Sequence, residues 1–333
     1  MSFLPESYQA LSVSPSARGA FFQEVSRRSL SELPSGEVLV RVAFSSLNYK
    51  DALSASGNRG VTKHYPHTPG IDAAGYVVSD ETGQFELDAP VIATGYDLGM
   101  NTAGGLAEYI RVPAAWLVRL PDGLSLREAM IYGTAGMTAA LCVEKLLRMG
   151  AKPQDGVVAV TGATGGVGSM AVALLAQRGF EVAAITGKLE ASGWLSQLGA
   201  KKVIDRSTFE ELVDRPLVSE HWAHAVDCLG GDYLFGLAKS LKYGGSVAAC
   251  GLSSSSDFNA NVFPFVLRGI NLLGVDSEKV ALEHREAIWD QLAGDYRLPL
   301  LGLMASEITL AQVPLHLDQL LNGHAVGRYL VRM

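Results

Sequence analysis

The sequence between residues 157 and 168 has the residue types and spacing that can hold a dinucleotide. Val157-Val-Ala-Val-Thr161 is apolar and β-branched, as in a buried parallel strand. Gly162, Gly165 and Gly168 follow at three-residue intervals, and an apolar helical repeat begins at Val167. Such glycines let the backbone approach a pyrophosphate that rests on the helix N-terminus. We therefore expect a phosphate-binding turn that opens a βαβ unit.

The residues after the next strand indicate which dinucleotide would bind. Glu181-Val-Ala-Ala-Ile185 forms that strand, and NAD would require an Asp or Glu at its end for the ribose 2′-hydroxyl. The sequence has Thr186-Gly187-Lys188 there instead, and Arg206 follows a third strand near Val203-Ile204. A hydroxyl, a backbone amide and two cations suit a 2′-phosphate, so we expect NADPH. The alternative, that Lys188 and Arg206 are solvated surface charges, stays open.

Composition bounds the class of protein. The 333 residues allow one large or two ordinary domains, and 48% hydrophobic with 18% charged residues can bury a substantial core. A formal net charge of −7 without long basic runs argues against a nucleic-acid surface. The sequence has no apolar run long enough for a membrane helix and no signal-peptide pattern at its start, so we expect a cytoplasmic protein. Its three cysteines form no C-x-x-C pair and are expected to be small buried apolar residues.

The distribution of strand and helix patterns predicts the fold. Residues 1–126 contain short strands separated by Gly, Pro and Asp, as in a β-rich barrel-like domain. Ser125-Leu-Arg-Glu128 has the pattern of a capping box, and strand–helix alternation then continues to about residue 276. Residues 297–333 again resemble the opening domain. We therefore predict an α/β protein in which a doubly wound Rossmann domain, residues 127–296, is inserted into a domain made of residues 1–126 and 297–333.

Seven motifs in order carry a family resemblance. They are Ser46-Leu-Asn-Tyr-Lys-Asp-Ala-Leu53, Pro69-Gly-Ile-Asp-Ala-Ala-Gly75, Gly104-Gly-Leu-Ala-Glu108, Gly133-Thr-Ala-Gly-Met-Thr-Ala139, Thr161-Gly-Ala-Thr-Gly-Gly-Val-Gly168, Ala248-Ala-Cys-Gly-Leu252 and Gly274-Val-Asp-Ser277. Together they resemble the medium-chain dehydrogenase/reductases over nearly the whole chain. Within that superfamily the sequence is most similar to the zinc-free quinone-oxidoreductase branch, and there to the bacterial NADPH-dependent acryloyl-CoA reductases.

The resemblance implies a GroES-like catalytic domain and a set of catalytic candidates. It puts Tyr49 beside the nicotinamide, where the side chain would orient the substrate or supply a proton, and puts Asn48 and Asp51 in the same pocket-forming segment. Two other interpretations stay open. Tyr49 could only form the wall of the pocket, with the proton coming from water, and Asp51 could cap a short helix.

The remaining cofactor contacts also follow from the resemblance. Thr164, Gly165, Gly166 and Val167 would surround the pyrophosphate, and Leu252, Val266 and Ser277 would lie along the nicotinamide half. The Asn322-Gly323 turn would close over it. The serines at 253–256 depart from the more apolar loop that the family pattern leads us to expect, which puts contacts of that loop in doubt.

No catalytic metal is expected. The ligand positions of the zinc alcohol dehydrogenases fall here on the Asn48-Tyr49 segment, on Gly70-Ile71-Asp72 and near Gly133, and the four-cysteine lobe is absent. The close histidine pairs, His64 with His67 and His221 with His224, are expected to be surface histidines. A short-chain dehydrogenase is excluded, because no tyrosine has a lysine four residues later.

These features favour a reductase of conjugated carbonyl compounds. Hydride would reach Cβ of an acyl-CoA, most simply acryloyl-CoA, while charge moves to an enolate oxygen. Alternatives are a quinone or enone reductase and, from another class, a non-catalytic NADPH-binding protein. The CoA phosphates would meet Arg59, Lys63, His64 and His67, unless that segment is simply a solvated loop. The apolar edge strand Asn271-Leu-Leu-Gly-Val275 favours a homodimer.

Overall fold

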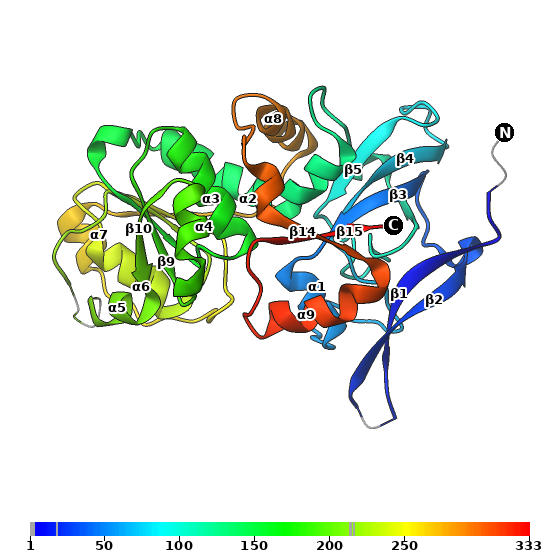
Figure 1. Ribbon diagram of the computed structural model, residues 1–333, viewed down its shortest axis with the longest axis horizontal. Helices are drawn as coiled ribbons and strands as arrows, with labels where there is room; N and C mark the ends of the chain where they lie inside the picture. Colours follow the sequence, from blue (N-terminus) through cyan, green and yellow to red (C-terminus); the bar gives the residue numbers. More distant parts are fainter. Residues whose placement is uncertain (1–3, 18, 213–214, 216) are drawn as a thin grey trace. The chain divides into compact units, whose positions relative to one another are not determined.

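The chain folds into two units, each with its own sheet (Figure 1). The computed structural model describes residues 4–17, 19–212, 215 and 217–333. Unit 1 comprises Met1–Thr134, Glu278–Gly294 and Leu301–Met333, and unit 2 comprises Ala135–Ser277 and Asp295–Leu300. These limits differ by several residues from the boundaries expected at 126 and 296, and they assign the segment Glu278–Gly294 to unit 1. The expected division into domains stays a prediction.

Unit 2 contains the parallel sheet. Its strands lie in the order β10 (Ala200–Asp205), β9 (Val182–Thr186), β8 (Val158–Thr161), β11 (His224–Asp227), β12 (Ser246–Ala249) and β13 (Asn271–Gly274). Every pairing in this sheet is parallel. The chain starts in the middle at β8, proceeds to one edge, and returns to β11 on the other side of β8. This is the predicted doubly wound order, with its switch point between β8 and β11.

Helices cover both faces of this sheet. Helices α3 (Gly166–Gln177) and α4 (Ser192–Gln197) lie on one face (Figure 1). Helices α5 (Arg206–Leu212), α6 (Gly231–Ser240) and α7 (Phe263–Arg268) lie on the other, where Phe209, Phe235 and Leu237 belong to one buried cluster with Val247 of β12. The strands β8 and β9 are buried along their whole length because both faces are covered.

Unit 1 is built around a mostly antiparallel sheet. The order is β14 (Ala305–Thr309), β15 (Arg328–Arg332), β3 (Val38–Ser46), β4 (Asp72–Asp80), β5 (Pro90–Thr94) and β7 (Leu117–Arg119), with β6 (Tyr109–Val112) also paired to β3. β1 (Ser7–Pro15) and β2 (Phe21–Ser29) form a separate hairpin. β14 and β15 pair in parallel, and β15 pairs antiparallel with β3. The C-terminal strands therefore complete the opening domain, as predicted.

Three helices lie in unit 1 among the described residues, besides the start of α2 and short 3-10 turns. They are α1 (Tyr49–Ala55), α8 (Leu282–Ala293) and α9 (Val313–Leu321). α1 and α9 share a buried cluster that includes Leu47, Ala52 and Leu317. Among the described residues of both units, 3-10 turns occur at Leu30–Glu32, Ala114–Trp116, Pro153–Asp155, Leu189–Ala191, Leu301–Met304 and Leu310–Gln312.

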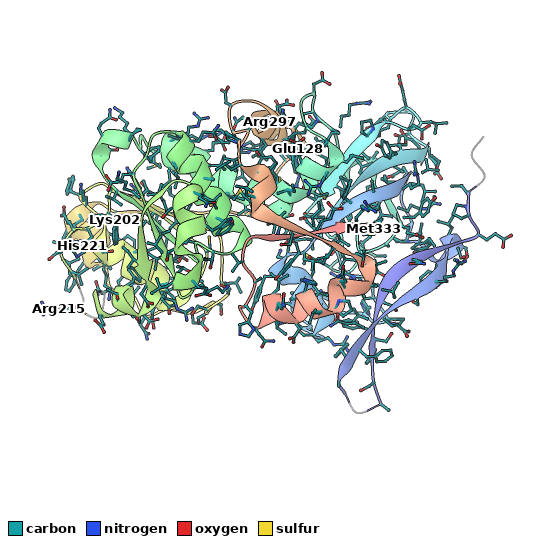
Figure 2. All side chains as sticks on the ribbon, in the orientation of Figure 1. Glu128, Lys202, Arg215, His221, Arg297 and Met333 are labelled. Carbon is teal, nitrogen blue, oxygen red and sulfur yellow. The ribbon has the colours of Figure 1, made fainter. Side chains whose placement is uncertain are left out.

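Helix α2 (Leu126–Arg148) begins as the sequence predicts but contains an unexpected break. The Glu128 side chain (labelled in Figure 2) accepts hydrogen bonds from the backbone and hydroxyl of Ser125, which confirms the cap. At Gly133 the backbone leaves the helical region, with φ 49° and ψ −155°.

Strands β2 and β7 were also not predicted from the sequence. Within the described part of the chain, no helix combines the length and apolar character needed to cross a membrane.

Candidate functional site

The glycine turn of unit 2 has the geometry of an anion-binding loop. Gly162 has φ 59°, a conformation that favours glycine, and a side chain at Gly168 would lie 2.3 Å from the Gly162 carbonyl oxygen. The turn closes with a 2.9 Å hydrogen bond from Gly165 N to Gly162 O. Helix α3 then begins at Gly166, and its N-cap residue Gly165 has no side chain to occupy the first amides. These amides and the helix dipole can receive a phosphate group.

The polar residues expected near a 2′-phosphate come together at the ends of β8, β9 and β10. The hydroxyls of Thr164 and Thr186 are 3.0 Å apart, and Lys188 N donates to the Thr186 hydroxyl over 3.1 Å. A side chain at Gly187 would lie 3.4 Å from the guanidinium carbon of Arg206. Thr186, Gly187 and Arg206 are therefore neighbours, because the paired strands β9 and β10 end side by side.

Two cations share this location. Burial lowers the pKa of Lys188; the carboxylate of Glu190 opposes the shift and the positive charge of Arg206 adds to it. The Arg206 guanidinium has a Glu210 carboxylate at 3.9 Å, and both side chains are about half exposed. Because the two cations lie within range of each other's charge, an anion bound between them would be stabilised by both.

The other predicted cofactor residues are spread over both units. In unit 2, Leu252 lies in the loop after β12, Val266 is an exposed residue of α7, and Ser277 follows β13. In unit 1, Asn322 is the C-cap residue after α9, where its side-chain amide donates to Asp318, and Gly323 follows with φ 70°. Their contact with a cofactor stays a prediction.

The Asn48–Asp51 segment of unit 1 begins helix α1. Asp51 is fully buried, and its carboxylate accepts hydrogen bonds from the backbone N–H groups of Asn48 (2.7 Å), Gly70 (3.1 Å) and Ile71 (2.9 Å). Asp51 therefore caps the helix and also fixes the turn before β4, which agrees with the helix-cap interpretation. Burial, followed by the charge of Asp72, raises the pKa of Asp51 to about 7.

Tyr49 and Asn48 differ in what their side chains contact. The Asn48 amide donates to Asp72 over 2.8 Å and accepts from Arg328 over 3.0 Å, so its polar atoms are engaged inside unit 1. Tyr49 is the first residue of α1 and is partly exposed. Within the described residues its hydroxyl has no hydrogen-bond partner. Of the three catalytic candidates, Tyr49 alone keeps a polar group available to a ligand in this part of the chain.

Asp72 and Arg328 form a buried ion pair that contacts the Asn48–Asp51 segment. The Asp72 carboxylate accepts hydrogen bonds from the Ser46 hydroxyl (2.6 Å) and the Asn48 amide, and it pairs with Arg328 over 3.4 Å. The exposed fractions are 0% for Asp72 and 3% for Arg328. Burial lowers the pKa of Arg328, and the carboxylates of Asp72 and Asp51 oppose that shift. Sequence reasoning missed Arg328, because nothing in β15 marks one arginine as buried.

The break in α2 completes this network. Past Gly133, the Thr134 N–H donates to both Asp72 oxygens over 3.0 Å, and the Thr134 hydroxyl donates to Asp72 over 2.6 Å. A side chain at Gly133 would lie 2.3 Å from the Asp72 carboxylate and 2.6 Å from the Ser46 hydroxyl. Glycine is needed here for both its positive φ and the lack of space.

The residues at this position do not suit a zinc ion. The structure brings Asn48, Asp72 and Gly133 together, as the expected ligand positions require, but only one of them carries a carboxylate. That carboxylate already accepts several hydrogen bonds and faces the Arg328 cation, whereas zinc needs three or four Cys, His or carboxylate ligands. Across the described ranges, no group of three or more potential ligands is placed to hold a metal ion.

Two predictions about histidines and cysteines are wrong. His67 and His224 are buried rather than on the surface: His67 is 2.9 Å from the Gly99 carbonyl, and His224 is 3.2 Å from Asp155. His67 therefore does not belong to an exposed approach for CoA. Among the cysteines only Cys142 is fully buried; Cys228 and Cys250 are partly exposed, and their sulfur atoms are 3.9 Å apart. Cys228 and Cys250 each directly follow a strand, and this shared position is the sequence signal that could have placed them together.

Comparisons with known proteins agree with this architecture. Residues 34–122 match the alcohol dehydrogenase GroES-like domain, and residues 166–292 match the family described as zinc-binding dehydrogenase. The chain is 44% identical to "Putative quinone oxidoreductase YhfP" of Bacillus subtilis (strain 168), over 92% of this chain and 93% of that protein. It is also 44% identical to "Acrylyl-CoA reductase AcuI" of Ruegeria pomeroyi, over 92% and 93%.

Solved structures of oxidoreductases are also similar to this chain over nearly its whole length. The yhdH oxidoreductase from Salmonella enterica in complex with NADP has a TM-score of 0.94 and 44% identity, covering 98% of this chain and 99% of that chain. Bacillus subtilis yhfP with NAD bound also has a TM-score of 0.94, at 42% identity, covering 99% and 100%. The chain belongs to the medium-chain dehydrogenase/reductase superfamily of oxidoreductases. The predicted fold and the resemblance to the quinone-oxidoreductase branch are confirmed.

Proposed function

We propose that the protein reduces an activated C=C bond with NADPH, and that acryloyl-CoA, converted to propionyl-CoA, is its substrate. The observation that supports NADPH as the cofactor is the cluster of Thr186, Gly187, Lys188 and Arg206 at the ends of β9 and β10. The support for the substrate is the 44% identity to a protein named acrylyl-CoA reductase over nearly the full length of both chains.

The residues of unit 2 fit NADPH better than NADH. The position after β9 holds a threonine, a glycine and a lysine, and no carboxylate stands there to bind a ribose 2′-hydroxyl and repel a phosphate. Two neighbouring cations instead favour an added negative charge. The pyrophosphate would lie on the N-terminus of α3, held by the amides of Thr164, Gly166 and Val167, while the Gly165 amide closes the turn. One relative, Bacillus subtilis yhfP, has been solved with NAD bound, and the preference of this chain for NADPH over NADH is therefore the quantity that tests the cluster.

The chain's own residues would orient the acceptor and help place a proton. A bound NADPH would supply a hydride for Cβ of the conjugated thioester, so the residues around the acceptor would have to stabilise the negative charge that develops on the thioester oxygen. The Tyr49 hydroxyl can donate a hydrogen bond to that oxygen or supply the proton to Cα, because it is partly exposed and has no partner within the described residues. Asn48 and Asp51 act as positioning residues, since their polar atoms hold the start of α1 in place.

Substitution of Tyr49 distinguishes its two interpretations. Tyr49→Phe removes the hydroxyl and retains the ring, so we expect kcat to fall by about 100-fold if the hydroxyl takes part. KM for the acceptor should change much less, since the ring still fills the same space. An unchanged kcat would show that Tyr49 only forms the pocket wall and that the proton comes from water.

Arg59 and Lys63 are proposed to meet the phosphates of CoA. Both are exposed in the segment after α1, where the Arg59 guanidinium lies 5.1 Å from the centre of the Tyr65 ring and donates to the Lys63 carbonyl. A second candidate function, reduction of quinones or enones, would not need these cations. It is favoured by the equally high identity to a protein named as a quinone oxidoreductase.

We also propose a cytoplasmic homodimer that forms through the edge strand β13. β13 is the last strand in the described order of the parallel sheet, and Leu272 on it is 43% exposed. Helix α7, which precedes β13 in the chain, exposes Val266 (75%) and Leu267 (59%), so both elements present apolar side chains that a second copy could cover. The three free cysteines are consistent with a reducing compartment. Light scattering should give a dimer for the native chain and a monomer for Leu272→Lys; a native monomer would contradict this.

Acceptor specificity tests the proposed substrate. Purified protein is given NADPH with acryloyl-CoA, crotonyl-CoA or 1,4-benzoquinone, and NADPH absorbance is followed. We expect kcat/KM to be highest for acryloyl-CoA and to fall about tenfold in an Arg59→Ala Lys63→Ala variant, with benzoquinone turnover unaffected by that variant. Turnover of benzoquinone alone would replace the thioester assignment with the quinone one.

A further inference from the structure

All three cysteines of the chain lie close together in unit 2. Cys228 directly follows β11 and Cys250 directly follows β12, and these are adjacent parallel strands in which Asp227 pairs with Ala249. Cys228 and Cys250 are therefore opposite each other, with their sulfur atoms 3.9 Å apart and both residues partly buried. Cys142 is buried in α2, near enough to Cys250 to affect its pKa.

This arrangement allows a disulfide after a small movement. Neighbouring strands lie about 4.8 Å apart, which is within the range of Cα separations that a disulfide bridges. The sulfur atoms would have to approach by about 2 Å to form the bond. Because Cys228 and Cys250 both lie just past their strands, loop backbone rather than sheet backbone would adjust.

Cys250 lies between the two other thiols and a backbone carbonyl: as a thiol it donates to the Asp227 carbonyl oxygen over 3.3 Å. The neighbouring Cys142 and Cys228 thiols lower the pKa of Cys250 well below its ordinary value, against the effect of burial. The same interactions raise the pKa of Cys142 and of Cys228. The lower pKa assigns the attack to Cys250 and the resolving step to Cys228, and the same disulfide forms if the two roles are exchanged.

The pair is in contact with the glycine turn. A side chain built on Gly162 would lie 3.3 Å from Cβ of Cys228, so that cysteine packs directly against the first glycine. The loop after Cys250 rests on the same backbone: Ser253 donates to the Cys228 carbonyl over 3.3 Å, and Ser254 N donates to Leu229 O over 2.8 Å. A disulfide would thus displace the backbone next to the phosphate turn.

We propose that Cys228 and Cys250 are a dithiol site for hydroperoxides, and that the disulfide formed there weakens NADPH binding at the adjoining glycine turn. The site itself requires only the thiols and the oxidant. Its effect on the cofactor rests on the proposed function of unit 2. In a reducing compartment such a disulfide would be transient and would report oxidative conditions.

The chemistry balances with a hydroperoxide as the oxidant. The Cys250 thiolate attacks the terminal peroxide oxygen, so an S–O bond forms, the O–O bond breaks, and the alkoxide leaves and takes up a proton. The Cys228 sulfur then attacks the sulfenic sulfur of Cys250; the S–S bond forms, the S–O bond breaks, and water leaves with the Cys228 proton. Two thiols lose two electrons in total, and the hydroperoxide is reduced to an alcohol and water.

Thiol mapping tests the site without substrate or cofactor. Native protein is treated with hydrogen peroxide, denatured, alkylated with N-ethylmaleimide and analysed by mass spectrometry. We expect all three thiols to be alkylated before oxidation and Cys142 alone afterwards, with a Cys228–Cys250 cross-linked peptide that dithiothreitol removes. Cys142→Ala is the matched control and should still form the cross-link. Three alkylated thiols after peroxide, or a cross-link that includes Cys142, would overturn the proposal.

NADPH titration tests the coupling. We expect the oxidised native protein to bind NADPH about tenfold more weakly than the reduced protein, and peroxide to leave the affinity of Cys228→Ala unchanged. By reciprocity, saturating NADPH should make the disulfide easier to reduce by the same factor. Equal NADPH affinity in the cross-linked and reduced protein would overturn the coupling. If the reduced protein bound no NADPH, the proposed function would fail, whereas the mapping result would stand by itself.

Discussion

Arg328 is a buried cation whose hydrogen-bonding capacity is fully used. Its five N–H groups have acceptors in the Ile131 carbonyl, the Leu47 carbonyl, the Asn48 amide, the Ser46 hydroxyl and the Asp72 carboxylate. A buried ion pair offsets its desolvation only when such additional bonds are made. The same interactions hold Asn48, and through it the start of the helix that carries Tyr49.

Removal of this cation should strongly destabilise unit 1. Arg328→Met leaves the Asp72 carboxylate buried without its cation, and we expect the free energy of unfolding to fall by about 3–5 kcal/mol. The matched control is Arg332→Met on the same strand, because Arg332 is 68% exposed and pairs with Glu307 only at 3.9 Å. That change should cost less than about 1 kcal/mol. Urea unfolding measures both; equal effects would contradict the importance assigned to the buried pair.

Asp51 should make stability depend on pH in an unusual direction. Its pKa is raised from 3.8 to about 7, so between these values the folded chain holds a proton that the unfolded chain has released. The contribution of Asp51 to stability is thus complete below pH 4 and is lost as pH rises through 7.

We expect the native free energy of unfolding to decline relative to Asp51→Asn by roughly 1 kcal/mol per pH unit in this window. Glu32 is the control, because hydrogen bonds from Ser29 N and Arg28 lower its pKa; Glu32→Gln should change the profile in the opposite sense. Parallel curves for the native chain and Asp51→Asn would refute the assignment.

At the scale of elements, the strands of the parallel sheet were predictable because their composition is local information. Runs such as Val157–Thr161 are apolar and bounded by glycine, and the structure places β8 at Val158–Thr161. Strand β2 was missed because its residues, Phe21–Ser29, are mostly polar and only partly buried. The break in α2 could not be predicted, since the acceptor that captures Thr134 N–H is Asp72, which is 62 residues away.

Gly133→Ala tests that break. The added Cβ would meet the Asp72 carboxylate at 2.3 Å and would require a positive φ, so we expect a loss of about 2–5 kcal/mol in unfolding free energy. Gly193→Ala in α4 is the control, because nothing lies within 4 Å of its added Cβ. That change should stabilise the protein by about 0.5–1 kcal/mol. Differential scanning calorimetry would show the opposite shifts in Tm; similar shifts would contradict the argument.

The sequence predicted only those parts of the candidate site whose residues lie close together along the chain. The glycine turn and the Asn48–Asp51 segment are continuous stretches, and both form the structures that the sequence favours. The ion pair and the dithiol depend on which distant strands become neighbours. Cys228 and Cys250 are 22 residues apart, and Arg328 reaches Asn48 across 280 residues.

At the scale of the whole molecule, the sheet of unit 1 is built from both ends of the chain. Its sheet begins at β3 but is completed by β15 from the C-terminal end, after all of β8 to β13 have been made. The residues that hold the Tyr49 segment therefore come from both ends of the chain. Unit 2, by contrast, forms its nucleotide turn and its cation cluster from residues 162–206 alone.

Cofactor preference is the most direct test of the account. The ratio of kcat/KM for NADPH to that for NADH is measured with acryloyl-CoA for the native chain and for Lys188→Ala Arg206→Ala. We predict a native ratio of about 100 or more, which falls toward one in the variant through a loss with NADPH while the value for NADH is retained. Equal native use of NADH, or an unchanged ratio in the variant, would contradict the claim that these residues recognise a 2′-phosphate.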